Sequence, residues 1–325
     1  MPEEPPREPS SPGRTPPRGG FRNAYGQTWR QPLLPLLKWR ITRMWRKPEG
    51  SDALPPAVEH DARLLASDEP HLTWIGHSTF ALRLGGRAVV TDPVWSRRIY
   101  YMVRRQRPGA PVNALPTIDV VTVSHNHYDH LDVPSLRKIA ELHDPVFLVP
   151  RRNGSILRRA GLGPVLEMDW WETYETGELA VTLVPAHHWS ARTPFSVNRM
   201  LWGGFVFEGP EGVAYHSGDT AYEPRMLRDI GERFAIDWAV MPIGAYHPEW
   251  FLASHHMGPE DAARALDDLR ARWLVPMHYG TFDITDEPRG EPLERIVAEF
   301  ERRGDPERLR ALAIGESCRL TRASG

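Results

Sequence analysis

Residues 125–130 read His-Asn-His-Tyr-Asp-His, so four side chains of the metal-ligand type fall within six residues, directly after an apolar run that predicts a buried strand. In an extended segment alternate side chains point the same way, so His125 and His127 can bind one ion. The turn that follows directs Asp129 and His130 towards a second ion. Imidazole and carboxylate ligands suit zinc, and iron and manganese are compatible with them. A polar loop with chance histidines is the alternative, but this pattern is rare by chance.

Ligand-type side chains elsewhere in the chain also stand directly after short apolar, β-rich runs. They are Asp92, His187, His188, His216, Asp219 and His278. In layered α/β folds the carboxyl ends of neighbouring strands meet at one edge of a sheet, where binding sites are assembled. Histidines scattered over a surface would not follow strands in this way. The placement therefore predicts a site at the strand ends.

The composition restricts the kinds of metal site and partner. The chain has 325 residues, 14 histidines, a net charge of -2 and one cysteine, Cys318. One cysteine forms neither an internal disulfide nor a pair of thiolate ligands, so any metal would be bound by His, Asp and Glu. Nucleic-acid-binding domains usually carry a strong basic excess, and the net charge therefore argues against a nucleic-acid partner.

The sequence also indicates where in the cell the protein is expected. No run approaches the roughly 20 apolar residues that span a bilayer, and residues 1–20 lack the apolar core of a secretory signal. We therefore expect a cytoplasmic protein, either soluble or peripheral to a membrane. The oligomeric state is left open.

Three regions follow from the distribution of residue types. Residues 1–20 hold seven prolines and predict a disordered tail. Residues 21–70 form a basic extension, in which residues 33–47 carry apolar side chains at helical spacing between Lys and Arg. Such a helix can lie on an anionic membrane surface, and the alternative is a helix packed on its own domain. Residues 71–325 alternate short β-rich runs with helical patterns, which is typical of an α/β domain.

The run at 125–130 matches the His-x-His-x-Asp-His signature of the metallo-β-lactamase fold. Further blocks make the chain resemble N-acyl-phosphatidylethanolamine-hydrolysing phospholipase D and its bacterial relatives. These blocks include TWIGHS at 73–78, DWWE at 169–172, LWG at 201–203, GDT at 218–220, PIGAY at 242–246 and HYGTF at 278–282. The resemblance implies that residues 71–325 form a catalytic domain with an α/β four-layer αββα sandwich. Two central sheets would face each other with helices outside, and the metals would lie at one edge.

The same resemblance implies a ligand set for two metal ions. One ion would be bound by His125, His127 and His188, the other by Asp129, His130 and His278, and Asp219 would bridge the two. The family's ligand precedes a tryptophan, which selects His188 rather than His187. The family pattern does not use His216. Taken alone, Asp219 is equally typical of a tight turn.

The catalytic residues follow from this arrangement. A hydroxide held between two ions would attack phosphorus or a carbonyl carbon, so the ligands Asp129 and Asp219 belong to the catalytic machinery. His256 aligns with a histidine of the family and is predicted to act as an acid or a phosphate contact. The alternative is a histidine that only caps or packs. We expect His77 and Asp92 to orient the ligands.

The sequence thus predicts a hydrolase with two zinc ions that cleaves a phosphodiester, of the phospholipase D type and acting on a lipid. The alternative is a hydrolase of a small soluble substrate, such as a sugar-phosphate lactone or a phosphoester. Aromatic side chains that could meet acyl chains, Trp189, Trp202, Trp250 and Phe251, would favour the lipid, although each of them taken alone is more typical of a core. Nucleic-acid processing is disfavoured by the net charge, and a non-catalytic scaffold by the complete ligand set.

Overall fold

The structure is a computed structural model that describes residues 20–25, 35, 38, 39, 42 and 50–321. The predicted disordered tail, residues 1–20, lies outside the described residues except for Gly20. Most of the proposed membrane-contacting segment, residues 33–47, lies outside them too. Its Trp39 is described: the ring centroid lies 5.6 Å from that of Phe251, and the indole N–H donates to Asp286. A helix packed on its own domain would make such contacts.

The first of two large sheets has seven strands in the order β15-β1-β2-β3-β6-β7-β8. These strands are β1 (His71–Gly76), β2 (Thr79–Leu84), β3 (Arg87–Thr91), β6 (Val120–Thr122), β7 (Val146–Pro150), β8 (Val165–Met168) and β15 (Ser317–Arg319). A separate hairpin joins β4 (Arg98–Ile99) to β5 (Met102–Val103). The edge strand β15 pairs with β1, so the two ends of the catalytic region meet in one sheet.

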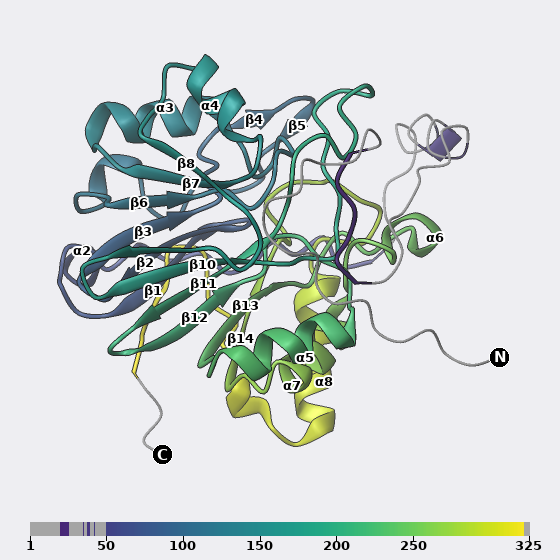
Figure 1. Ribbon diagram of the computed structural model, residues 1–325. Coiled ribbons are helices and arrows are strands. Elements are labelled where there is room, and N and C mark those ends of the chain that lie inside the picture. Colours follow the sequence, from purple (N-terminus) through teal and green to yellow (C-terminus); the bar gives the residue numbers. More distant parts are fainter. Residues whose placement is uncertain (1–19, 26–34, 36–37, 40–41, 43–49, 322–325) are drawn as a thin grey trace.

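The second sheet has six strands in the order β14-β13-β12-β11-β10-β9. They are β9 (Thr173–Thr176), β10 (Leu179–Val184), β11 (Gly204–Gly209), β12 (Gly212–His216), β13 (Trp238–Pro242) and β14 (Trp273–Met277). This sheet faces the first, and their inner side chains share the main hydrophobic core (Figure 1).

Helices cover the outer faces of both sheets. The first sheet is covered by α2 (Ala62–Leu65), α3 (Val133–Leu142) and α4 (Gly154–Arg159), and the second by α5 (Pro224–Arg233), α7 (Pro259–Asp268) and α8 (Glu291–Arg303). The short α6 (Glu249–Leu252) lies apart from these layers, and two 3-10 turns span Val112–Ala114 and Pro306–Arg308. The predicted four-layer αββα sandwich is therefore confirmed. None of the helices formed by the described residues has the length and apolar character needed to cross a membrane.

Neighbouring residues of the inner strands face two different cores. In β6, Val120 belongs to the main core between the sheets, whereas Val121 belongs to the smaller core under α3 and α4. In β7, Leu148 and Phe147 divide in the same way. Because side chains alternate between the two faces of a strand, a strand covered on both sides must be apolar on both. This explains the continuous apolar runs in the sequence.

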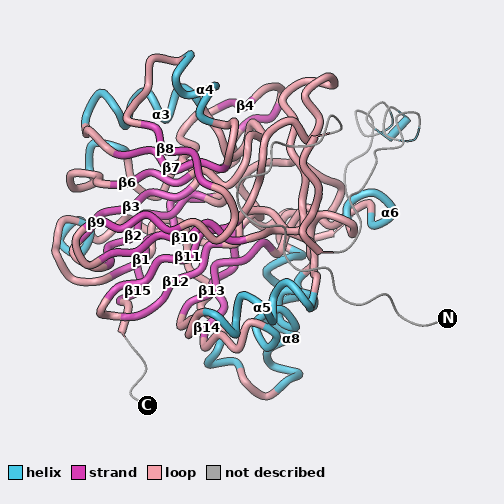
Figure 2. Tube along the Cα trace, viewed as in Figure 1, coloured by secondary structure: helices cyan, strands magenta, loops and turns pink. Residues whose placement is uncertain are grey.

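The open edge of the sandwich is set by parallel strands. Strands β3, β6 and β7 run parallel to one another, as do β12, β13 and β14. Their carboxyl ends therefore share an edge, and the loops that follow them gather on one side of the sheets (Figure 2). The loop that contains residues 125–130 ends where the Asp132 carboxylate accepts from the Ser135 N–H and caps α3. This cap fixes the far end of the loop.

Phe205 of β11 is fully buried in the main core, so Phe205→Ala should leave a cavity between the sheets. We expect the free energy of unfolding, measured by chemical denaturation, to fall by about 3–5 kcal/mol. Phe195 is 92% exposed and supplies the matched control, because Phe195→Ala should change the same quantity by less than about 0.5 kcal/mol. Similar losses for the two variants would contradict the placement of Phe205.

Candidate metal centre

The seven predicted ligands lie together at the open edge, in two groups of side chains. The first group is His125, His127, His188 and Asp219, and the second is His77, Asp129, His130 and His278. Within each group the ligand atoms lie within 4.8 Å of one another. The second group also contains His77, which the sequence analysis expected to orient the ligands.

The first group has the spacing that a tetrahedral ion requires. His127 Nδ1 lies 2.8 Å from His125 Nε2 and 3.3 Å from His188 Nε2. Asp219 Oδ2 lies 3.7 Å from His125 Nε2 and 3.8 Å from His188 Nε2. Ligand atoms around a tetrahedral zinc with bonds of about 2.0–2.1 Å lie roughly 3.3 Å apart. The four residues therefore fit one cation.

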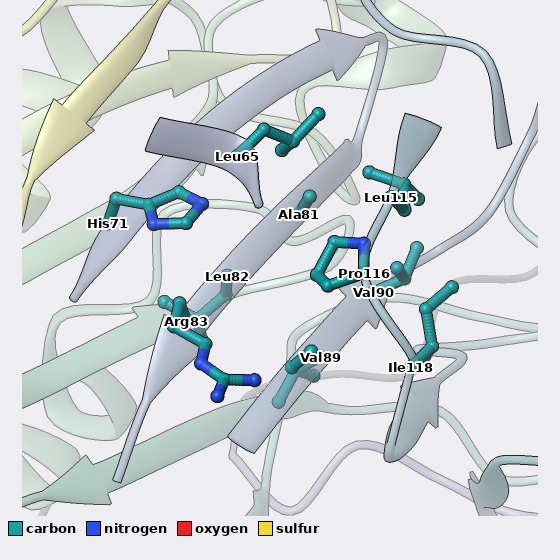
Figure 3. A pocket seen from close by; sticks show the side chains of 11 residues that line it. Leu65, His71, Ala81, Leu82, Arg83, Val89, Val90, Leu115, Pro116 and Ile118 are labelled. Carbon is teal, nitrogen blue, oxygen red and sulfur yellow. The ribbon is translucent and has the colours of Figure 1, made fainter. Parts of the chain in front are cut away.

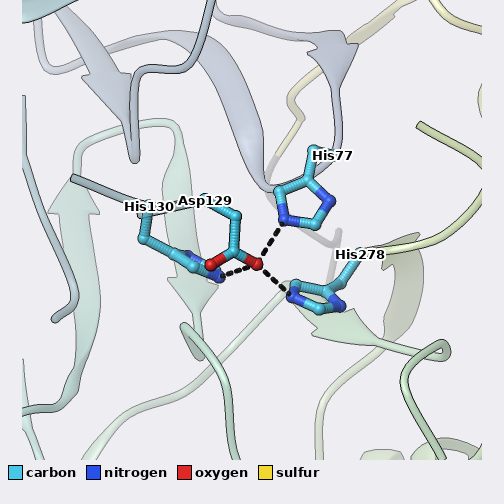
Figure 4. A group of neighbouring side chains, drawn as sticks. All are labelled: His77, Asp129, His130 and His278. Carbon is cyan, nitrogen blue, oxygen red and sulfur yellow. Dashed lines mark hydrogen bonds and ion pairs between the residues drawn. The ribbon is translucent and has the colours of Figure 1, made fainter. Parts of the chain in front are cut away.

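The second group converges on the carboxylate of Asp129 (Figure 4). Its Oδ2 lies 3.1 Å from His77 Nε2, 3.4 Å from His278 Nε2 and 3.6 Å from His130 Nε2. Asp219 also reaches this group, since its Oδ2 lies 3.1 Å from His130 Nε2 and its Oδ1 lies 3.2 Å from His278 Nε2. One carboxylate therefore contacts both groups, which is the geometry that a bridging ligand needs.

Several of these buried atoms are not satisfied by the protein. Among the described residues, His130 Nε2, His278 Nε2 and Asp219 Oδ1 have no partner with hydrogen-bonding geometry, although they lie close together. Buried polar atoms are almost always satisfied, because an unpaired one costs about 1–3 kcal/mol. A shared cation would satisfy them together. The imidazole and carboxylate donors suit zinc, iron or manganese equally.

The charges of the first group favour a cation. Burial lowers the pKa of His127 to about 3 and that of His188 to about 4. Burial alone would raise the pKa of Asp219, but His130 and the histidines around it hold that pKa well below its usual range. At neutral pH these imidazoles are therefore neutral and the carboxylate is ionised, as metal ligands must be.

The second group differs in its protonation. Burial alone would lower the pKa of His278, but Asp219 and Asp129 raise it to about 9. The pKa of His130 also lies well above its usual value, because neighbouring carboxylates outweigh burial. Binding of a cation by these two imidazoles therefore releases protons.

A buried carboxylate behind the ligands fixes the orientation of one histidine in each group. Asp92 Oδ2 accepts from His130 Nδ1 at 2.7 Å and from Ser124 Oγ at 2.6 Å. The Ser124 hydroxyl has one hydrogen, so its oxygen accepts from His125 Nδ1 at 2.9 Å. In both His125 and His130, Nδ1 is therefore used by a hydrogen bond and Nε2 faces the position of a metal ion. The structure agrees with the expected role of Asp92 and adds Ser124, which the sequence analysis missed although it directly precedes the motif.

Backbone geometry supports the same centre. His77, Asp92 and His278 have φ angles of 55°, 37° and 63°, in the left-handed region that non-glycine residues rarely adopt. Such conformations persist where the surrounding structure enforces them, commonly at functional sites. The His255 carbonyl accepts from His188 Nδ1 at 2.8 Å and so directs Nε2 of His188 into the first group. The sequence offered no signal for this backbone contact.

The two histidines left out of the predicted ligand set occupy other positions. Both ring nitrogens of His216 contact the backbone, Nε2 at the Ser78 carbonyl and Nδ1 at the Gly218 N–H. His216 therefore supports the turn that carries Asp219. His187 belongs to none of the ligand groups that the described residues form.

His256 lies beside both groups. Its ring centroid is 5.1 Å from that of His188 and 5.4 Å from that of His278, and the side chain is 8% exposed. It forms a third group of converging ligand atoms with Asp219 and His278. Burial holds its pKa well below the usual value, so the imidazole is neutral. The position fits a contact with a bound substrate.

A separate small hollow lies beside α2, β2 and β3 (Figure 3). Its volume is about 10 Å³, which is the space of a single water molecule. Leu65 and Ile118 are among its mainly apolar lining, with His71 and Arg83. It has no room for a substrate.

Comparisons with known proteins agree with this site. A family model described as a beta-lactamase superfamily domain matches residues 87–279. An uncharacterized protein of Mycobacterium tuberculosis is 38% identical over 259 residues, which cover 77% of this chain and 68% of the relative. N-acyl-phosphatidylethanolamine-hydrolyzing phospholipase D 1 of Caenorhabditis elegans is 33% identical over 250 residues, which cover 72% of this chain and 70% of the relative.

A solved structure shares the fold. The metallo hydrolase of the hyperthermophilic archaeon Ignicoccus hospitalis matches with a TM-score of 0.59 and 24% identity, over 77% of this chain and 97% of that one. The family match spans the strand ends from β3 to β14, where the ligand groups are assembled. This chain therefore belongs to the beta-lactamase superfamily and is a metal-dependent hydrolase with the metallo-β-lactamase fold.

Proposed function

We propose that this hydrolase uses two zinc ions to cleave a phosphodiester of a lipid, with an activity of the N-acyl-phosphatidylethanolamine phospholipase D type. The observation that carries the proposal is the cluster of two ligand groups joined by Asp219. The relative from Caenorhabditis elegans, which is named for this activity, supports the choice of substrate.

The metal roles in this proposal follow the two groups. His125, His127 and His188 would hold one ion, Asp129, His130 and His278 would hold the other, and Asp219 would lie between them. When bound, two such ions supply an activated water near neutral pH and offset the negative charge of a phosphodiester. Asp92 and Ser124 keep the ligands in the required tautomers, and His77 holds the Asp129 carboxylate through its 3.1 Å contact.

His256 has a different role in the proposal. Its neutral imidazole lies next to both groups, so a ring N–H can donate to a phosphate oxygen of the substrate. A hydrogen bond from a buried donor to a charged oxygen is strong, because little water competes for it. His256 thereby orients the phosphodiester over the ligand groups.

Aromatic side chains around the metal loop support a lipid substrate. Tyr128, within the loop itself, is 38% exposed, and its ring stacks on that of Tyr100, which is 71% exposed. The Arg192 guanidinium lies 3.9 Å from the centre of the Tyr128 ring. Phe195, on the same loop as Arg192, is 92% exposed. These side chains offer apolar surface to acyl chains and a positive charge to a phosphate.

The remaining parts of the proposal concern partners and regions. A phospholipid is the proposed partner, with peripheral membrane contact through residues 33–47. The division into a tail at 1–20, a basic extension at 21–70 and a catalytic region at 71–325 stays a prediction. Within the extension, residues 21–25 contact the catalytic region directly.

The first test combines metal analysis with turnover. The purified chain should bind two zinc ions and release phosphatidic acid from an N-acyl-phosphatidylethanolamine in mixed micelles. Two bound metals without lipid turnover would favour the alternative, a small soluble phosphoester or lactone. A zinc-treated chain that binds no metal would contradict the proposal as a whole.

Asp219→Asn should lose one or both ions, because the amide cannot offset the charge of two cations. We expect turnover to fall at least about 100-fold, the loss typical when a charge-stabilising group is removed from a reaction centre. Metal content by elemental analysis and initial rates check this. Asp144→Asn, at an exposed position, is the matched control and should keep both ions. Full metal content in Asp219→Asn would refute the bridging role.

Ser124→Ala removes the acceptor that fixes the tautomer of His125. Loss of such a hydrogen bond behind a metal ligand should lower the zinc affinity of the first group about 10- to 100-fold. Competition with a zinc chelator measures this affinity. Ser67→Ala, which lies just after α2 and away from the ligands, should leave the affinity unchanged. Wild-type affinity in the Ser124 variant would mean that the hydroxyl does not orient His125.

A further inference from the structure

Residues 20–25 lie against the open edge of the sandwich, far in sequence from the ligands they approach (Figure 1). The Phe21 N–H donates to the Asn198 carbonyl at 2.7 Å, and the Tyr25 hydroxyl donates to Asp229 on α5. Phe21, Ala24 and Tyr25 also pack against the main core. The segment is therefore anchored at both ends, on the loop after His188 and on a helix of the second sheet.

Asn23, between these anchors, contacts the backbone of a proposed metal ligand. Its Oδ1 accepts from the His188 N–H at 3.1 Å and from the Trp202 indole N–H at 3.1 Å. The indole N–H also donates to the Ala186 carbonyl at 3.0 Å. Among the described residues, the structure gives the His188 N–H one acceptor, and that acceptor is Asn23. The contact spans 165 positions of the sequence.

We propose that Asn23 is a positioning residue of the metal centre, which fixes His188 through its backbone N–H. This inference rests on the proposed role of His188 as a ligand. His188 Nδ1 is held by the His255 carbonyl, so the ring is fixed at its far nitrogen and the main chain is fixed by Asn23. With both held, His188 Nε2 points to the atoms of the first group, 3.3 Å from His127 Nδ1.

The chemistry of the contact distinguishes positioning from packing. Phe21 and Tyr25 already provide apolar contacts, whereas the Asn23 oxygen accepts from two N–H donors, the backbone of the buried His188 and the indole of the buried Trp202. These two bonds need an acceptor oxygen, which an aspartate keeps and a leucine of similar size lacks. The N-terminal segment thus completes a proposed metal centre whose ligands all follow strands of the two sheets.

The test is zinc affinity in the full chain, measured by chelator competition for Asn23→Leu, Asn23→Asp and Arg22→Ala. Asn23→Leu should lower the affinity for one of the two zinc ions about 10- to 100-fold, as expected when a hydrogen bond to a metal ligand is lost. The affinity for the second ion should stay unchanged. Asn23→Asp should bind both ions as the wild type does. Arg22 is exposed on the same segment, so Arg22→Ala should also keep both ions.

Cobalt substitution gives a second measurement. The visible absorption of cobalt bound in place of zinc depends on ligand geometry, so Asn23→Leu should change the spectrum of one site while Asn23→Asp restores it. If Asn23→Leu is too bulky to fold, Asn23→Ala removes the same oxygen without added volume and takes its place in both measurements. Wild-type affinity and spectrum in the variant without the oxygen would overturn the inference. Equal losses in Asn23→Asp would overturn it too, because the acceptor would then not matter.

Failure of this inference and failure of the proposed function give different results. A wild-type chain that binds two ions but cleaves no phosphodiester leaves the role of Asn23 testable by affinity alone. A wild-type chain that binds no zinc removes the proposed function and, with it, the basis of the inference. Full zinc affinity in every Asn23 variant, with normal turnover, would reject the role of Asn23 alone.

Discussion

The Asp219 carboxylate contacts both groups of histidines, and each group contains residues that follow strands of both sheets. Asp219 follows β12 of the second sheet, yet its Oδ2 lies 3.1 Å from Nε2 of His130, which comes from the loop after β6 of the first sheet. Its Oδ1 lies 3.2 Å from His278, after β14. A buried carboxylate is tolerated only where opposite charge compensates it. At the open edge of the sandwich, the histidines around Asp219 provide this compensation.

Behind the predicted ligands, hydrogen bonds fix the direction of three of the rings. Asp92 reaches His130 directly and His125 through Ser124, and the His255 carbonyl holds His188. Imidazole has two nitrogens, and only one of them can bind a given metal ion. A hydrogen bond at the other nitrogen fixes which one that is. Left-handed backbone conformations at His77, Asp92 and His278 place these side chains, and packing of the surrounding strands keeps those conformations populated.

The fold and the substrate are specified by different parts of the chain. The family match shows a metal-dependent hydrolase, and many substrates are compatible with a centre of this kind. The features that favour a lipid lie outside the sheets, in the exposed rings of Tyr100, Tyr128 and Phe195 and in Arg192 beside them. Loops tolerate variation better than strands do, so substrate choice can change while the metal centre is kept.

The sequence by itself predicted the sandwich and the seven clustered residues through the family that its motifs resemble, and those motifs are short local patterns. Apolar strands end at ligand-type side chains, and the run at 125–130 has a distinctive spacing that a short segment carries alone. Only the tertiary structure brought His77 to the Asp129 carboxylate, the His255 carbonyl to His188, and Asn23 across 165 positions to the same ligand. Backbone carbonyls and N–H groups are the same at every residue, so a sequence does not reveal which ones will orient a ligand. Contacts between distant segments depend on how the strands and loops pack, and that packing is decided by the whole chain.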